Sequence, residues 1–322
     1  MSTMIRILSA FFCLLFLSFF LSACGTQGSE DQLKIAFIPK SFTDPFWLDA
    51  IVGAELAAEK WGVKLMVNSP SDDTKVVEQV QIVENMIQLG LDGIVLAPSD
   101  SDALLSAVLK ANAAKIPLSI IDTDVNGGER ITFAATDNNL CSSMAVDHLV
   151  ARLGGKGKIA AISCTQSIST CRDLYNGFVE RLKKYPGMEL VSTPLGVPFC
   201  DKTFDAVTDL LTAHPDLRGI YVFGGPAVLC AVKSAQAFGR KLGTDLFLVG
   251  RSSNSRAGAK DLEAVKQGEL DAVVVQFPEK MGFFSVESIV NFYKGTSSPA
   301  FTNTGTELVT AKNVEEFLAK ID

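Results

Sequence analysis

The feature that most constrains the fold is a regular alternation of short apolar runs with longer segments whose apolar residues recur at helical spacing. The run LKIAFIP at 33–39 is almost wholly apolar, as a parallel strand covered by helices on both faces requires. The segment 46–61 follows Pro45 and ends before Gly62, and 76–87 places its apolar residues on one helical face. This alternation predicts an α/β protein.

The same pattern continues to the end of the chain. Strands are expected at 33–39, 63–67, 93–97, 117–122, 131–135, 158–163, 188–193, 219–223, 246–249, 272–276 and 307–309. Helices are expected at 46–61, 76–87, 102–114, 140–153, 172–184, 202–213, 227–238, 257–267 and 279–293. Two successive strand–helix runs without a long linker predict two Rossmann-like lobes, each a doubly wound parallel sheet. A chain of 322 residues is long enough for both.

Charge and motif content exclude several functions. The formal net charge of −7 argues against a nucleic-acid partner, which needs a clustered basic surface. The two histidines, His148 and His214, fall within or just after helical patterns, where no metal trio or Cys/His dyad can be assembled. The glycine-rich segment 154–158 precedes a strand and lacks phosphate-loop spacing, so it is interpreted as a turn. We therefore expect neither an enzyme nor a metal or cofactor site.

The N-terminus carries a targeting signal. Residues 7–21 form an uncharged apolar run after Arg6, and Leu-Ser-Ala-Cys at 21–24 resembles the lipobox of bacterial lipoproteins. The resemblance implies a signal peptide at 1–24, a lipid on Cys24 and a polar tether at 25–32. The protein would then be periplasmic or at the cell surface, anchored to a bacterial membrane by its lipid. The alternative is an uncleaved anchor helix, and the sequence leaves inner and outer membrane undecided.

Five cysteines remain once Cys13 and Cys24 are set aside, and an oxidising compartment permits some of them to pair. Cys164 and Cys171 flank a short Ser/Thr-rich loop and are the favoured disulfide, with Cys171–Cys200 as the rival. Cys141 and Cys230 fall in helical patterns and are expected to be small buried hydrophobes.

Polar and aromatic side chains gather where the expected strands end, which is where open α/β sheets bind ligands. Hydroxyl groups of a sugar need fixed donors and acceptors, and its C–H face stacks on an aromatic ring. Several of these residues have structural alternatives: core aromatics for Phe46 and Trp47, a helix cap or turn for Asp122, and a structural salt bridge for Arg172. The candidates from the strand ends are Lys40, Asp44, Phe46, Trp47, Asp122, Thr123, Arg172 and Gln276.

Several motifs together resemble the ribose-type periplasmic sugar-binding proteins of ABC importers. They are IAFIPKSFTDPFW (35–47), GIVLAPSDSDAL (93–104), ATDN (135–138), STCRDLYNGF (169–178) and VVVQFP (273–278). The resemblance covers 33–309 and implies two lobes joined by a three-strand hinge, with crossings near Asn138, Gln276 and Gly305. It implies an N-terminal lobe of 33–137 plus 277–305 and a C-terminal lobe of 138–276 plus 306–322.

The resemblance also implies ligand positions at Asp44, Phe46, Trp47, Asp122, Arg172 and Gln276, and some hexose binders of this group share Lys40. Thr123 stands where Arg is common, Gly224-Gly225 where Asn is usual, and Ser252 where a carboxylate is usual. The resemblance also implies an aromatic side chain in the second lobe. Only Phe199 lies near that place, and the alternative is that Pro198 occupies it. Arg251 is expected to point away from the cleft, because strand residues alternate faces. Since Ser252 removes an acid while Lys40 and Arg172 remain, we expect a modified or anionic monosaccharide, such as a sugar acid, a phosphate or a furanose-like compound.

The function implied is that of a monomeric solute-binding lipoprotein of an ABC importer, which binds a sugar between its lobes and docks on permease subunits. The alternative is a ligand sensor that presents bound sugar to a chemoreceptor or a sensor histidine kinase. A sugar-responsive repressor with the same core would need an N-terminal helix-turn-helix, and the lipobox stands there instead.

Overall fold

The computed structural model describes residues 32–197 and 199–321, and Leu33–Asp322 forms one compact unit. The expected signal peptide, Cys24 and nearly all of the tether lie outside the described residues, as does Pro198. Among the described helices, none is both long and apolar enough to cross a membrane.

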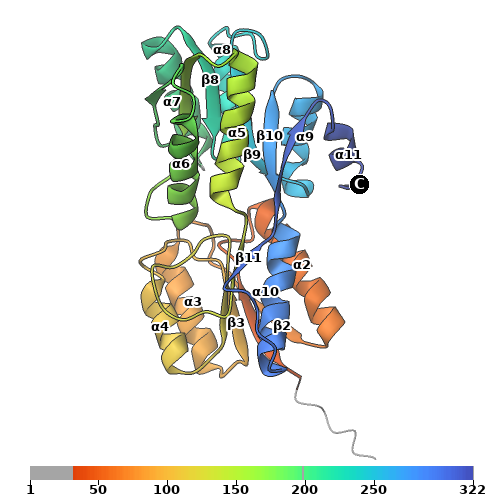
Figure 1. Ribbon diagram of the computed structural model, residues 1–322. Coiled ribbons are helices and arrows are strands. Elements are labelled where there is room, and N and C mark those ends of the chain that lie inside the picture. The colour runs from red at the N-terminus through yellow and green to blue at the C-terminus, as the bar shows by residue number, and fades with distance from the viewer. Residues whose placement is uncertain (1–31, 198, 322) are drawn as a thin grey trace, which may run out of the picture. The chain divides into compact units, whose positions relative to one another are not determined.

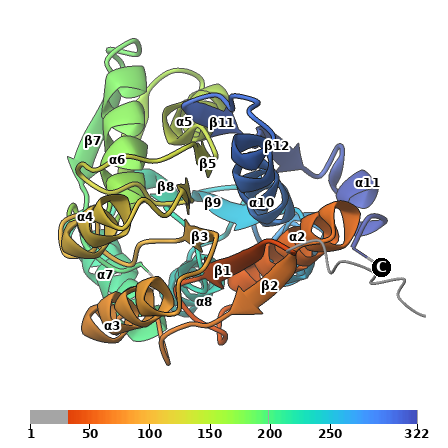
Figure 2. The same ribbon diagram turned by 90° about the horizontal axis from the view of Figure 1, so that it is seen from below.

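The first lobe is built on a six-stranded sheet in which all paired strands are parallel (Figure 1). In spatial order its strands are β11 (Phe301–Asn303), β5 (Phe133–Ala135), β4 (Leu118–Ile121), β3 (Gly93–Leu96), β1 (Lys34–Ile38) and β2 (Lys64–Val67). Its helices are α2 (Pro45–Trp61), α3 (Val76–Gln88), α4 (Leu105–Ala113) and α10 (Pro278–Tyr293). Seen from below, α2 and α10 lie on one side of this sheet and α3 and α4 on the other (Figure 2).

The second lobe repeats this plan. Its six strands are β12 (Thr306–Thr310), β10 (Ala272–Gln276), β9 (Phe247–Ser253), β8 (Leu217–Val222), β6 (Gly157–Ile162) and β7 (Met188–Ser192). Its helices are α5 (Asn138–Leu153), α6 (Ser169–Leu182), α7 (Cys200–Ala213), α8 (Ala227–Ala237), the 3₁₀ turn η1 (Arg256–Gly258), α9 (Ala259–Lys266) and α11 (Val314–Leu318). The predicted fold class of two parallel-sheet α/β lobes is confirmed, with the exception that β12 pairs antiparallel to β10.

The strands are apolar throughout because both of their faces are covered. In β1, Ile35 and Phe37 pack under α2 and α10, whereas Ala36 and Ile38 pack under α3 and α4. Helices α2 and α10 approach very closely, since a Cβ on Gly53 would lie 1.8 Å from the carbonyl oxygen of Glu279. Glycine is therefore required at this crossing.

The chain passes between the sheets three times. It leaves the first sheet after β5 and enters α5 at Asn138, returns between β10 and α10, and crosses again between β11 and β12. Gly305, in the third crossing, has φ +92°, a conformation that few residues other than glycine adopt. In Figure 1 the β11–β12 segment, in dark blue, crosses the boundary from the lower lobe into the upper one.

Candidate functional site

A cavity of about 780 Å³ is lined by residues of both lobes, at the carboxyl ends of their strands. This volume lies within the range of small-molecule sites, about 300–1,000 Å³. Seven of the nine residues expected from the sequence line it: Lys40, Asp44, Phe46, Trp47, Asp122, Ser252 and Gln276. Thr123 and Arg172 do not.

Asp122 is the centre of the polar side of the cavity. Its Oδ2 lies 3.0 Å from Lys40 Nζ and accepts a hydrogen bond from Thr123 Oγ1 at 2.9 Å. Burial opposes ionisation of this carboxyl, but the charges of Lys40 and Arg251 outweigh it and hold the pKa below its usual range. Asp122 also has φ +59°, a strained backbone conformation of the kind that clusters at functional sites.

Thr123 contacts both Lys40 and Asp122 but does not line the cavity. Its side chain is fully buried, accepts a hydrogen bond from Lys40 Nζ at 2.7 Å and contacts Thr170 Oγ1 at 3.0 Å. It was expected to touch the ligand, but its short side chain reaches only Lys40, Asp122 and Thr170. The structure therefore makes Thr123 a residue that positions Lys40 and Asp122.

Arg251 enters the site from the second lobe, which corrects the expectation that it points away. Its side chain is buried, and Nη2 donates to Gln276 Oε1 at 2.6 Å and to Asn138 Oδ1 at 3.4 Å. A Cβ on Gly224 would lie 3.1 Å from the carbonyl oxygen of Arg251, and Gly224 has φ +124°, so a larger residue there would be strained and would press on the arginine backbone. Strand alternation failed as a guide because consecutive residues at the end of β9, Arg251 and Ser252, both line the cavity.

The aromatic side of the cavity comes from the start of α2. Asp44 caps this helix by accepting a hydrogen bond from Phe46 N at 2.9 Å, and Pro45 occupies its first position. Burial raises the pKa of Asp44, although the hydrogen bond from Phe46 N opposes the shift. The rings of Phe46 and Trp47 meet edge to face with centroids 4.8 Å apart. Trp47 is 3% exposed and also belongs to the core, whereas Phe46 is half-buried.

Ser252 is backed by a carboxylate that the sequence analysis missed. Its Oγ donates to Asp261 Oδ2 at 2.7 Å, and both residues line the cavity. Burial raises the pKa of Asp261 to about 6, and the hydrogen bond from Ser252 opposes this shift. The acid absent at position 252 thus has a counterpart nine residues later in the chain, at the start of α9.

Two disulfides contribute to the side of the cavity formed by the second lobe, where Cys164, Cys171 and Cys230 line it. They join Cys164 to Cys171, the pair favoured from the sequence, and Cys200 to Cys230. The expectation that Cys230 is an unpaired hydrophobe is wrong, and the rival pair Cys171–Cys200 does not form, because the N-terminus of α7 lies against α8. Cys141 is buried and unpaired, as expected. Phe199 lines the cavity with Lys202 Nζ 4.6 Å from its ring.

Arg172 lies outside the cavity, contrary to expectation. Thr170 and Cys171 face the cavity from the first turn of α6, and helical geometry turns Arg172 to another side. Its guanidinium donates to Gln166 O at 2.9 Å and, across the lobe boundary, to Asn126 Oδ1 at 2.8 Å. The structure shows Arg172 as a bridge between the lobes.

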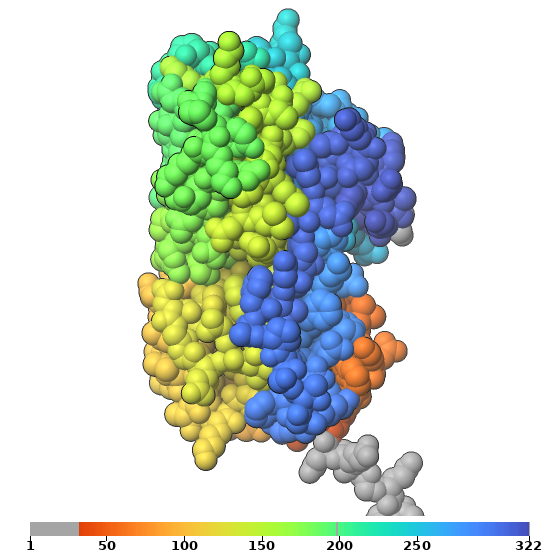
Figure 3. All heavy atoms as spheres, in the orientation of Figure 1, coloured from red at the N-terminus to blue at the C-terminus, as the bar shows by residue number. Residues whose placement is uncertain are grey.

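Further hydrogen bonds join the lobes on two sides of the cavity. On one side Ser169 N donates to Ser101 Oγ at 3.0 Å, and Thr170 Oγ1 donates to Asp122 O at 2.7 Å. On the other, Asp49 of α2 accepts hydrogen bonds from Ser255 Oγ and Ala257 N. On the face drawn in Figure 3, the green and yellow atoms of the two lobes meet along the boundary. The lobes are therefore closed on the cavity.

Two buried polar atoms beside the cavity have no hydrogen-bond partner among the described residues: Ser99 Oγ from the first lobe and Arg251 Nε from the second. Buried polar groups are normally paired, so each invites a ligand or water. Within the described ranges, no group of three or more His, Cys, Asp or Glu side chains could hold a metal ion. The arrangement can bind a polar ligand with an apolar face.

Comparisons with known proteins agree with this geometry. The family model of the periplasmic binding protein domain matches residues 35–297. The ribose import binding protein of Salmonella typhimurium is 29% identical over 279 residues, which cover 85% of this chain and 90% of that protein.

Solved structures show the same fold. An ABC transporter solute binding protein from Agrobacterium vitis with bound D-fucose has a TM-score of 0.81 and 29% identity, covering 89% of this chain and 98% of that one. A carbohydrate transporter solute binding protein from Agrobacterium radiobacter in complex with D-arabinose has a TM-score of 0.82 and 25% identity. The match covers 91% of this chain and 100% of that one.

Proposed function

The chain belongs to the periplasmic binding protein family, and from this premise we propose that it binds a monosaccharide, or a modified or anionic sugar, between its lobes for an ABC importer. The family implies a periplasmic location, and the chain is a binding protein rather than an enzyme. The names of its relatives support a sugar as the ligand, since they include ribose import binding proteins and a structure with bound D-fucose.

The observation that carries the proposal is the pairing of aromatic side chains with fixed polar groups in one cavity between the lobes. Phe46 and Trp47 line the cavity, where aromatic rings would contact the C–H groups of a sugar. Asp122 accepts and Lys40 donates hydrogen bonds to hydroxyl groups, and the ion pair between them holds both side chains in place. The unpartnered Ser99 Oγ supplies a further group.

The mechanism of binding is closure of the lobes on the sugar. Because Asp122 and Arg251 belong to different lobes, a ligand that contacts both favours the closed arrangement over an open one. The three crossing segments, near Asn138, Gln276 and Gly305, would act as the hinge. The closed form, with Ser101 and Ser169 in contact, is the one that we expect permease subunits to recognise.

A thermal-shift screen tests this function. The purified protein is heated with pentoses, hexoses, sugar acids and sugar phosphates, and with amino acids and nucleosides as controls. We expect at least one sugar or sugar derivative to raise the melting temperature, because a ligand that binds only the folded state stabilises it. Stabilisation by an amino acid or a nucleoside, and by no sugar, would reject the proposal.

We also propose that the protein is a lipoprotein held at the membrane by an acylated Cys24, with residues 25–32 as its tether. The support is the lipobox-like sequence at 21–24. A Cys24→Ser variant should move from the membrane fraction to the soluble fraction on cell fractionation. Retention in the membrane would favour an uncleaved anchor helix.

A further inference from the structure

The two walls of the cavity carry opposite charge. The first lobe contributes Lys40 and four acids, Asp44, Asp73, Asp100 and Asp122. The second lobe contributes Lys202, Lys233, Arg251, Arg256 and Lys260 with a single acid, Asp261. The formal charge is therefore −3 on the first wall and +4 on the second.

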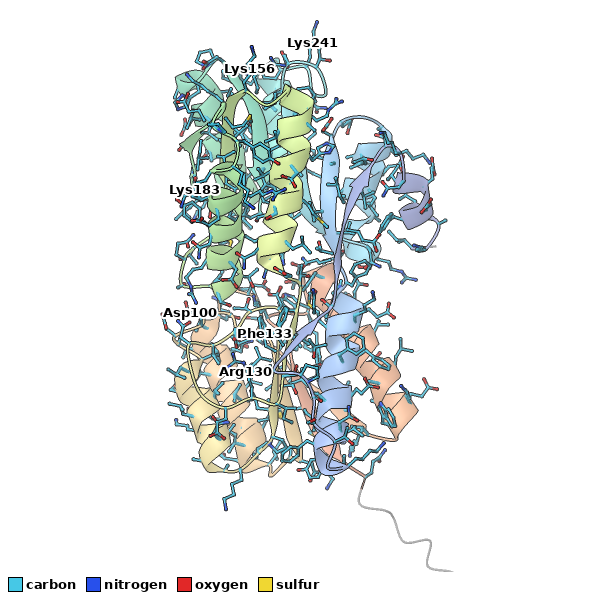
Figure 4. The ribbon with its side chains drawn as sticks, in the orientation of Figure 1. Asp100, Arg130, Phe133, Lys156, Lys183 and Lys241 are labelled. Atoms are coloured by element: carbon cyan, nitrogen blue, oxygen red, sulfur yellow. A yellow bond between two sulfur atoms is a disulfide. The ribbon has the colours of Figure 1, made fainter. Side chains whose placement is uncertain are left out.

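The positive wall is a local feature, because the whole chain carries a formal net charge of −7. Figure 4 shows Asp100 at the edge of the lower lobe beside the boundary, whereas Lys156, Lys183 and Lys241 lie away from it on the upper lobe. A cleft wall of one sign raises the local concentration of ligands of the opposite sign.

Arg251 is the buried part of the positive wall. All of its hydrogen bonds to described residues leave from Nη2, and Nε has no partner among them. Its nearest acid is on the opposite lobe, where Asp122 Oδ1 lies 3.7 Å from Nη2 and already faces Lys40. A planar guanidinium with free donors is suited to a carboxylate or a phosphate.

Asp261 is the one acid of this wall and stands against five cations, so it does not offset their charge. It accepts a hydrogen bond from Ser252 Oγ, and the serine therefore presents a lone pair rather than a charge to the cavity. The four remaining cations of the wall, Lys202, Lys233, Arg256 and Lys260, are exposed at its rim.

We propose that the ligand is an acidic sugar whose anionic group lies against the second lobe beside Arg251, while its hydroxyl groups and apolar face contact Asp122, Lys40 and Trp47 of the first lobe. The inference rests on the proposed sugar-binding function. It names the charge of the ligand and its orientation between the lobes.

Calorimetric titration with matched pairs tests the charge. The pairs are D-galactose with D-galacturonate, D-glucose with D-glucuronate, and D-ribose with D-ribose 5-phosphate; the phosphate pair separates a phosphate from a carboxylate. We expect the acidic member of at least one pair to bind ten-fold or more tightly than its neutral partner. If a neutral sugar binds as tightly or more tightly, the anionic inference fails and the sugar-binding function stands. If none of the six compounds binds, the inference is rejected for this series, and the thermal-shift screen decides the function.

Variants of the second wall test the orientation. Arg251→Gln should reduce the preference for the acidic member at least ten-fold. Lys202→Gln combined with Lys233→Gln changes only exposed residues and should reduce it several-fold, which keeps the test valid if the Arg251 variant does not fold. Lys156→Gln, which removes a cation far from the boundary, should leave the preference unchanged. An unchanged preference in the Lys202/Lys233 variant would overturn the inference.

Discussion

Arg251 Nη2 lies 3.7 Å from Asp122 Oδ1, although the two residues belong to different lobes. Lys40 holds the other oxygen of the same carboxylate at 3.0 Å, so one buried acid faces two cations. Such a group is stable only while its partners stay in place. The charge balance of the candidate site therefore depends on side chains from both lobes.

Phe46 tests aromatic stacking with less effect on the fold than Trp47 does. Phe46→Ala should weaken sugar binding by about 1–3 kcal/mol, or roughly 5- to 150-fold, because a stacking surface is lost. Its melting temperature should change little, since Phe46 is half-buried. Trp47→Ala, by contrast, should also destabilise the fold by about 3–5 kcal/mol, because Trp47 is buried in the core. Calorimetry and thermal melting of both variants separate the two effects, and unchanged affinity in Phe46→Ala would remove stacking on Phe46 from the account.

Asp261 should make stability depend on pH. Its pKa is about 6 in the folded protein and ordinarily 3.8, so the folded state binds more protons between these values. The free energy of unfolding therefore falls as the pH rises from about 4 to about 6, by about 3 kcal/mol. Asp261→Asn should be more stable than the parent at pH 7 and should lose this advantage near pH 4. Urea denaturation at the two pH values measures the difference, with Glu269→Gln, an exposed change, as control; equal differences at both would contradict the assignment.

The two disulfides should contribute unequally to stability. Cys200–Cys230 spans 30 residues and Cys164–Cys171 spans 7, and a longer closed loop restricts the unfolded chain more. Replacing both cysteines by alanine should lower the free energy of unfolding by about 3–4 kcal/mol for the longer loop and about 2–3 kcal/mol for the shorter one. Urea denaturation under non-reducing conditions compares them, and the opposite order would argue against loop entropy as the main term.

Asp49 should control closure without touching the sugar. It lies on α2 and accepts hydrogen bonds from Ser255 and Ala257 of the other lobe. Asp49→Ala removes these contacts from the closed form only, so affinity should fall by about 3- to 30-fold, the equivalent of one or two hydrogen bonds. Stopped-flow binding should show the loss mainly as faster dissociation. Affinity equal to that of the parent would mean that this contact does not favour closure.

The fold could be predicted from the sequence because the two kinds of element differ in pattern. Strands such as 33–39 are buried on both faces and form continuous apolar runs, whereas helices such as 76–87 are buried on one face and repeat apolar residues at helical spacing. The short edge strand β11 and the five-residue helix α11 were missed, since three to five residues carry no readable period. The antiparallel direction of β12 depends on how the chain re-enters the second sheet after the crossing between β11 and β12. A local sequence pattern does not show this path.

Asp44 and Trp47 could be placed at the cavity from the sequence, because they follow the first strand closely and the carboxyl ends of the strands border the cavity. Arg251 and Asp261 were missed because a local pattern does not show what their side chains contact. Arg251 faces Asp122 of the other lobe, and Asp261 accepts a hydrogen bond from Ser252 across the connection between β9 and α9. Arg172 was placed wrongly because the turn at which α6 begins decides which residue faces the cavity. The pairing of Cys230 likewise depends on how α7 meets α8.

A crystal structure of the protein with the sugar that binds most tightly tests the central claim most directly. The account predicts density for one sugar enclosed between the lobes, within hydrogen-bond distance of both Asp122 and Arg251 and against the ring of Trp47. Density on the outer surface, or a cavity that holds only water at saturating sugar, would contradict it.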